Sequence, residues 1–224
     1  MNGGPSEWGA EARAAFADAR DPAPLAKAVV TFYRRIDEVI DVTVRGHAVA
    51  VACKRGCDYC CHLRLTVQPH EAFALAAWIK RRFNAERVAE VLARLRANAR
   101  ATEAMGVEAR KRTNMRCALL GDDGACTVYE ARPAQCRRYH STRLATCKAF
   151  FDNPADEKLE SPMHEAVAHN AAVLITQAQH AVRAAGLDAE NEDMNFALLD
   201  ALDNPKAWRR WRDGKKPFVG AGRG

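Results

Sequence analysis

Several features that would assign the chain to other classes of protein are missing from its sequence. No stretch contains the roughly 20 uncharged apolar residues that a membrane-spanning helix needs. Charged side chains interrupt the first twenty residues, so the continuous apolar core of a secretory signal is lacking. We therefore expect a cytoplasmic protein with no membrane partner, a location in which disulfide bonds are disfavoured.

Strand patterns, repeats and familiar catalytic motifs are also scarce. No segment alternates apolar and polar residues for more than a few positions, and no internal repeat is visible. A glycine-rich phosphate loop, a supported Ser-His-Asp order and a paired-carboxylate motif are absent. The 224 residues are 48% apolar, which is enough to bury a core. These observations predict a mainly α fold and leave open whether the chain is an enzyme.

Excess charge of one sign is modest. The 34 Lys and Arg residues against 28 Asp and Glu give a net charge of +6, which makes nucleic acid an unlikely partner. Eleven basic and four acidic residues lie between Lys80 and Arg116, a pattern that favours a solvated helix face over an anion-binding surface. We interpret Trp208–Arg212 as an amphipathic end whose tryptophans cover the helices rather than stack on bases.

Helical spacing of apolar residues dominates what is present. It extends over residues 25–51, 72–83, 88–99 and 166–181, with a shorter pattern at 194–202. The first pattern predicts a long helix that runs directly into Cys53, and we expect the fourth to cover the cysteine region. The expected organisation is a flexible N-terminus (1–21), a cysteine-cluster metal-binding domain (22–150), C-terminal helices packing on it (151–214) and a flexible tail (215–224).

Cysteine occurs only between positions 53 and 147. There are two groups of four: Cys53, Cys57, Cys60 and Cys61, then Cys117, Cys126, Cys136 and Cys147. Thiols crowded into one stretch of a cytoplasmic chain indicate metal ligands, because thiolates bind soft cations. Eight thiolates make two four-ligand shells, although one four-ligand cluster with bystander cysteines remains an alternative. The expected fold is a helical bundle with an irregular cysteine-rich metal-binding knot.

Local spacing supports metal binding by the first group. The two residues between Cys57 and Cys60 let the chain turn and direct both sulfurs at one ion. Adjacent Cys60 and Cys61 point in different directions in most backbone conformations, so they could serve two metals or two atoms of one cluster. Cys53-x3-Cys57-x2-Cys60 also matches the cluster triad of radical S-adenosylmethionine enzymes, but the βα repeats of those enzymes are missing here.

The motifs around the cysteines carry a family resemblance. The Cys53-to-Cys61 run, the later Cys117-Ala-Leu-Leu and the Tyr129-x-x-Arg-Pro-x-x-Cys136-Arg block resemble the zinc- or iron-chelating cysteine-cluster family (YkgJ-like). The resemblance covers about residues 50 to 150 and implies that all eight cysteines bind metal. It also relates the chain to flagellin lysine N-methylases, which carry a similar cluster region.

Residues next to the cysteines admit further interpretations. We expect His62, His70 and His140 to be hydrogen-bonded rather than ligands, and Tyr129 and Tyr139 to pack. Arg132 is either a buried ion-pair partner that holds the loop or a substrate clamp. Several arginines adjacent to cysteines could tune or neutralise a thiolate centre: Arg55, Arg64, Arg132, Arg137 and Arg138.

Three functions are compatible with these features. The first is a metal-binding protein that holds an iron–sulfur cluster or zinc ions, with the cysteine spacing slightly favouring iron. The second is an iron–sulfur-dependent protein-modifying enzyme similar to the lysine N-methylases. The third is a non-catalytic, zinc-stapled module that presents its basic helices to a protein partner.

Overall fold

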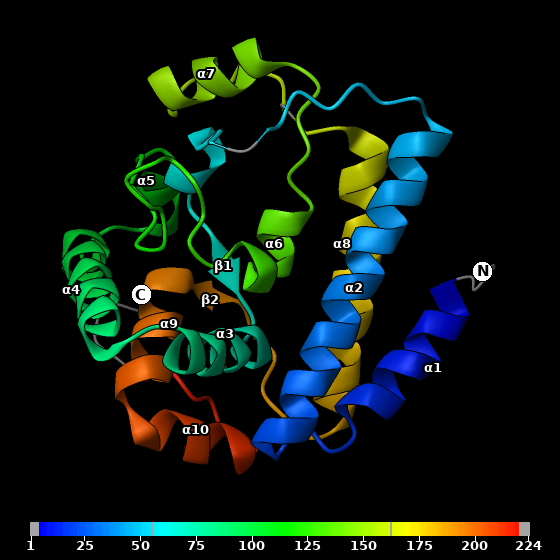
Figure 1. The fold of residues 1–224 in the computed structure, drawn as a ribbon, viewed down its shortest axis with the longest axis vertical. Coiled ribbons are helices and arrows are strands. Elements are labelled where there is room, and N and C mark those ends of the chain that lie inside the picture. The colour runs from blue at the N-terminus through cyan, green and yellow to red at the C-terminus, as the bar shows by residue number, and fades with distance from the viewer. Residues whose placement is uncertain (1–4, 55, 162, 220–224) are drawn as a thin grey trace.

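The computed structural model describes residues 5–54, 56–161 and 163–219, and helices dominate it (Figure 1). The α-helices are α1 (Pro5–Phe16), α2 (Pro22–Gly46), α3 (Pro69–Arg82), α4 (Ala85–Thr102), α5 (Val107–Lys111), α6 (Ala134–Arg137), α7 (Leu144–Asp152), α8 (Glu165–Ala184), α9 (Met194–Asp203) and α10 (Pro205–Arg212). Two short strands, β1 (Thr66–Val67) and β2 (Glu192–Asp193), pair antiparallel. The predicted mainly α fold is confirmed.

Helices α1, α2 and α8 pack side by side and form one flank of the molecule (Figure 1). The apolar face of α2 supplies Phe32 and Ile36 to the core, and Trp8 of α1 stacks on Phe32 with ring centroids 6.3 Å apart. Residues 5–16, expected to belong to a flexible N-terminus, are therefore an ordered helix. Residues 1–4 lie outside the described part of the chain.

The long helix ends earlier than its apolar spacing predicted. Helix α2 stops at Gly46, and Ala48 adopts a left-handed conformation with φ of 49°. A residue in that conformation cannot continue a right-handed helix. A non-helical segment therefore connects α2 to Cys53, and the expectation that the helix runs directly into this cysteine was wrong.

Helices α3, α4 and α9 pack together around a second cluster of buried residues that includes Leu75, Ile79, Leu95 and Leu198. Polar side chains cap the first turns of α3 and α4. At α3 the Glu71 carboxylate accepts from the backbone N–H of Gln68 over 3.3 Å. At α4 the side chain of Asn84 accepts a 2.8 Å hydrogen bond from the backbone N–H of Arg87.

The C-terminal helix α10 packs on the core that α1, α2 and α8 share, as interpreted from its tryptophans. Trp211 is fully buried, and its indole N–H donates to the carbonyl of Asp188 over 2.7 Å. Phe218 is also buried, with its ring centroid 5.5 Å from that of Phe73. The expected flexible tail is thus anchored at Phe218, while residues 220–224 lie outside the described ranges.

Helix α8 packs against α1 and α2 instead of covering the cysteines, which corrects the prediction for this helix. Its apolar face packs against those two helices, with Val167, Ala171 and Ala178 fully buried.

The basic stretch from residue 80 to 116 is largely a solvated face. There, Arg87 pairs with Glu90 and Arg96 with Asp203. Across the described ranges, every helix is too short or too polar to cross a membrane.

Candidate metal centre

The first cysteine group lies on a looped segment between α2 and β1. The backbone N–H of Cys57 donates to the carbonyl of Lys54 over 3.0 Å, which closes a turn, and Gly56 takes the positive φ of 81° within it. Cys60 and Cys61 follow on one turn of 3-10 helix, η1 (Tyr59–His62). The loop therefore presents the first four sulfurs from a short stretch of chain.

Backbone hydrogen bonds join the second group to the first. The N–H of Cys117 donates to the carbonyl of Cys61 over 2.8 Å, and Met115 donates to His62 over 2.8 Å. Residues 121–124 form a turn, with a 3.2 Å hydrogen bond from the N–H of Gly124 to the carbonyl of Gly121. It leads to Cys126, which forms an isolated antiparallel bridge with Leu120.

Gly124 brings the two cysteine loops into contact. Its φ is +74°, and a Cβ atom at this position would lie 3.3 Å from the carbonyl oxygen of Gly56. A side chain here would be strained by the backbone conformation and crowded by the opposite loop. Glycine thus allows the turn of the second group to sit against the turn of the first.

Cys136 is carried by the short helix α6, which long-range polar contacts hold in place. The buried carboxylate of Glu71 on α3 accepts from the backbone N–H of Ala134 over 2.8 Å and from the Tyr33 hydroxyl over 3.1 Å. Arg137, next to Cys136, forms an ion pair with Asp37 of α2. Two of the larger helices therefore determine where this sulfur lies.

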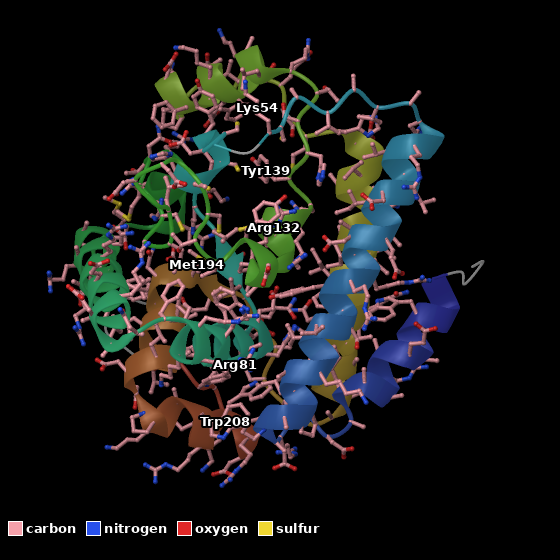
Figure 2. The ribbon with its side chains drawn as sticks, viewed as in Figure 1. Lys54, Arg81, Arg132, Tyr139, Met194 and Trp208 are labelled. Atoms are coloured by element: carbon pink, nitrogen blue, oxygen red, sulfur yellow. The ribbon has the colours of Figure 1, made fainter. Side chains whose placement is uncertain are left out.

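Cys147 is carried by α7, a regular helix within the region that was expected to be an irregular cysteine-rich knot. Phe151 of α7 packs edge-on against Tyr59 and His62 of η1, with centroid distances of 5.6 and 4.9 Å. On the same side of the site, the N–H of Ser141 donates to the Cys53 sulfur over 3.3 Å, and Ala52 donates to the Ser141 carbonyl over 2.7 Å. Figure 2 places Lys54 beside α7, with Tyr139 and Arg132 between it and α6.

Electrostatic interactions divide the thiols into two sets that meet at Cys60. Burial raises the pKa of Cys57, and the charges of Cys53, Cys60 and Cys147 raise it further. Burial also raises the pKa of Cys147, where Cys53 and Cys60 again contribute. The outer set, defined as Cys53, Cys57 and Cys147, therefore has Cys60 as its neighbour.

The inner set, defined as Cys117, Cys126 and Cys136, behaves in the same way. Burial raises the pKa of Cys117 to about 11, and Cys126 and Cys60 add to that shift. Burial raises the pKa of Cys136 well above its usual value, with Cys117, Cys60 and Cys126 contributing. Cys60 is thus an electrostatic neighbour of both sets.

Cys60 itself interacts most strongly with its sequence neighbour. A hydrogen bond with the Cys61 thiol is the largest cause of the raised pKa of Cys60, and burial is the second cause. Arg132 opposes the shifts at Cys60, Cys126 and Cys136 through its positive charge. A vicinal pair with a nearby guanidinium therefore lies where the two sets meet.

The other residues singled out in the sequence have different roles. His62 lies with Nδ1 3.1 Å from the carbonyl oxygen of Asp58, and His70 is buried among aromatic rings away from the sulfurs. Arg64 forms an ion pair with Asp193, with 3.9 Å between its Nε and the Oδ2 of the carboxylate. Arg132 forms no ion pair within the described residues, so the ion-pair interpretation of this residue was wrong. Arg55 lies outside the described part of the chain.

The donor set fits a thiophilic metal, although the side chains are not arranged around one. All eight cysteines are free thiols, and nearby thiolate charges contribute to the raised pKa values of six of them. Among the described residues, no group of three or more His, Cys, Asp or Glu side chains has ligating geometry. Soft sulfur donors whose charges repel one another are suited to zinc or iron, because the cation neutralises that charge.

The protein is mainly helical, and backbone hydrogen bonds join its two cysteine groups in one region. Residues 52–158 match the family model described as "CxxCxxCC: Putative zinc- or iron-chelating domain". The match spans all eight cysteines and extends beyond α7. No curated protein and no solved structure gives a significant match to the chain.

Proposed function

We propose that the eight cysteines chelate metal as two sets of four thiolates. The outer set (Cys53, Cys57, Cys147) and the inner set (Cys117, Cys126, Cys136) would each be completed by one member of the Cys60–Cys61 pair. The observation that carries this proposal is the 2.8 Å hydrogen bond from the N–H of Cys117 to the carbonyl of Cys61, which brings the second cysteine group to the Cys60–Cys61 pair. The charge of Cys60 also contributes to the raised pKa of thiols in both sets. Adjacent cysteines with different side-chain directions suit two neighbouring centres.

Between the two metals of the family description, we infer iron. The vicinal pair and the Cys53-x3-Cys57-x2-Cys60 spacing favour an iron–sulfur cluster, and Arg132 supplies a positive charge that would tune it. A bound metal would supply charge neutralisation and, in the case of iron, electron transfer. The chain's own residues contribute the thiolates and the cationic neighbour. Since free thiolates persist under reducing conditions, we place the protein in the cytoplasm.

The test is metal analysis of protein purified without air, combined with its absorption spectrum. We expect at least about one equivalent of metal per chain. Iron would give a visible band that dithionite bleaches, whereas zinc would give a colourless protein. Less than about half an equivalent of either metal, with all thiols open to alkylation, would refute chelation. Exposed Glu38→Ala on α2 is the matched control and should bind metal as the wild type does.

A further inference from the structure

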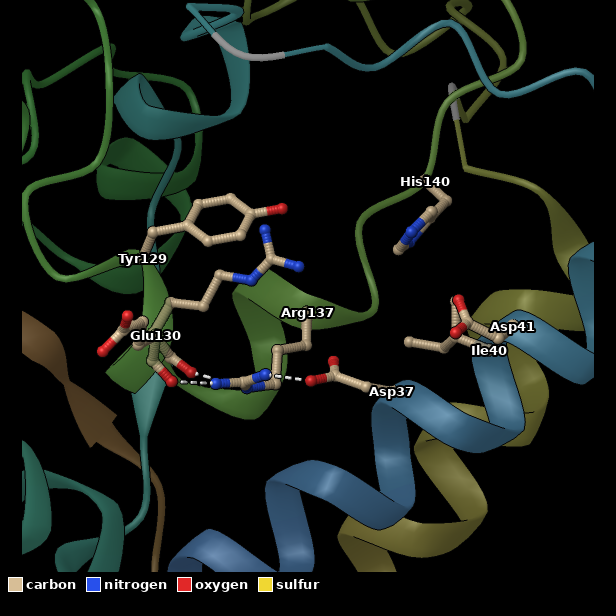
Figure 3. A pocket seen from close by; sticks show the side chains of 8 residues that line it. Asp37, Ile40, Asp41, Tyr129, Glu130, Arg137 and His140 are labelled. Atoms are coloured by element: carbon tan, nitrogen blue, oxygen red, sulfur yellow. Dashed lines mark hydrogen bonds and ion pairs between the residues drawn. The ribbon is translucent and has the colours of Figure 1, made fainter.

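A cavity of about 390 Å³ lies beside the cysteine region (Figure 3). Asp37, Ile40 and Asp41 of α2 form one wall, while Tyr129 and His140 come from the segment that also carries Cys136. The residues that line it include no cysteine. The metal-binding proposal therefore leaves this cavity without a role.

Some of the charges that line the cavity are already paired. Arg137 binds Asp37, and its guanidinium also donates to the backbone carbonyls of Glu130 and Arg132. The carboxylate of Glu130 lies 4.0 Å from Arg82 on the outer surface. Among the described residues that line the cavity, Arg132 and Asp41 form no ion pair.

Contacts with Tyr129 and Arg137 hold Arg132 in position. Its guanidinium carbon lies 4.0 Å above the Tyr129 ring, and its carbonyl accepts from Nε of Arg137 over 2.9 Å. Its own Nε is buried and has no hydrogen-bond partner among the described residues. A guanidinium presents its N–H groups as a planar fork that matches a carboxylate. The Arg132 side chain therefore offers an anion site that the described chain does not fill.

Asp41 provides the complementary charge. It lies one helical turn after Asp37 on the exposed side of α2, and within the described residues its carboxylate forms no ion pair. Figure 3 shows Asp41 across the cavity from Tyr129, with His140 above it. The buried Nδ1 of His140 also lacks a hydrogen-bond partner in the described part of the chain. This wall can accept an ammonium group.

We propose that this cavity binds a small zwitterion of the amino-acid type. Its carboxylate would pair with Arg132, its ammonium group with Asp41, and its side chain would lie against Ile40 and the Tyr129 ring. Small-molecule sites of a few hundred Å³ commonly combine apolar walls with a few convergent polar groups, and this cavity does so. The proposal does not require that the cysteines bind metal.

Calorimetric titration of the purified full chain, with whatever metal it carries, tests this proposal. Each proteinogenic L-amino acid is titrated first. The tightest binder is then compared with the amine that lacks its carboxylate and the acid that lacks its amine. We expect the amino acid to bind at least about tenfold more tightly than either analogue, because each analogue leaves one charge unpaired. Failure of every amino acid to bind with a Kd below about 10 mM would overturn the proposal.

Two variants assign the charged groups, and Glu38→Gln on the same helix is the control. Asp41→Asn should weaken binding of the amino acid by about tenfold and leave binding of the deaminated acid unchanged. Arg132→Gln should weaken the binding of both compounds. Because Arg132 also lies near the sulfurs, the metal content of each variant is measured, and Asp41→Asn remains decisive if Arg132→Gln loses metal. Wild-type affinity in Asp41→Asn would overturn the assignment of the ammonium site.

Discussion

The backbone N–H of Cys117 donates a 2.8 Å hydrogen bond to the carbonyl oxygen of Cys61. These two residues are far apart in the chain, and each lies at the edge of a cysteine group. The bond brings the first group and the second group into one region, which the charge interactions at Cys60 also indicate. The predictions below follow from this convergence and from the contacts that support it.

Paired cysteine substitutions test the division into two sets. Replacing Cys53 and Cys147 together should remove about half of the bound metal, because both belong to the outer set. Replacing Cys136 and Cys147 together should remove nearly all of it, because one thiol is lost from each set. Elemental analysis of the two Ser/Ser variants makes the comparison. Equal losses in both variants would argue for a single shared centre.

Metal removal should loosen the cysteine region and spare the helical flank. Treatment with a chelator, after reduction if iron is present, is expected to increase amide exchange in residues 57–63 and 113–147. These segments have few helical hydrogen bonds of their own, whereas α1, α2 and α8 share a buried core. Hydrogen-exchange mass spectrometry measures both regions, with α8 as the internal control. Unchanged exchange in the cysteine segments would contradict a structural role for the metal.

Glu71→Ala should destabilise the protein by about 3 kcal/mol, because three buried donors lose their acceptor. These are the N–H groups of Gln68 and Ala134 and the hydroxyl of Tyr33. Glu71→Gln retains one accepting oxygen and should cost less. Urea denaturation provides the measurement.

The exposed Glu38→Ala variant is the control for that experiment, and its stability should change by less than about 0.5 kcal/mol. If Glu71→Ala were as stable as this control, the carboxylate would not anchor α6. Because α6 carries Cys136, we also expect Glu71→Ala to retain less metal than Glu38→Ala.

His70 should make the fold sensitive to acid. Burial lowers its pKa to about 3, and neither ring nitrogen has a hydrogen-bond partner among the described residues. Below the unfolded-state pKa of about 6.5, only the unfolded chain takes up the proton. The stability is therefore complete above that pH and decreases as the pH falls towards the folded-state pKa. The expected loss is about 2 kcal/mol between about pH 6.5 and 5.

Urea midpoints measured across this pH range check the role of His70. His70→Leu should remove its share of the decrease, since leucine does not titrate and leaves no unpaired nitrogen in the aromatic cluster with Phe16. His169→Leu, at an exposed position of α8, should keep the wild-type dependence. The same pH dependence in all three proteins would show that another group is responsible.

Sequence reasoning recovered the features that short-range physics controls. The apolar spacing over residues 72–83 and 88–99 corresponds to α3 and α4, and the Trp208–Arg212 pattern lies in a helix with a buried tryptophan. The eight cysteines were recognised as candidate ligands because the chemistry of a thiol does not depend on the fold. The end of α2 at Gly46 was missed, because the helical spacing of apolar residues continues past Gly46 although the backbone is no longer helical there.

The residues that the sequence did not reveal act across long separations in the chain. Asp37 and Asp41 are one turn apart on the polar face of α2, a pattern also typical of any solvated helix. Glu71 lies in the first turn of α3, where an acidic residue is common, yet its contact with Ala134 depends on how α3 meets α6. No local signal distinguishes such residues from their neighbours.

By itself, the sequence determined the helical class and the chemistry available, because spacing, capping and thiol content are properties of short segments. Only the tertiary structure decided which thiols are neighbours, that Cys60 lies between two sets, and that Arg132 faces a cavity with Asp41 on its other wall. Those relationships arise from hydrogen bonds and packing between distant segments. Their geometry exists only once α2, α3 and the cysteine loops have come together.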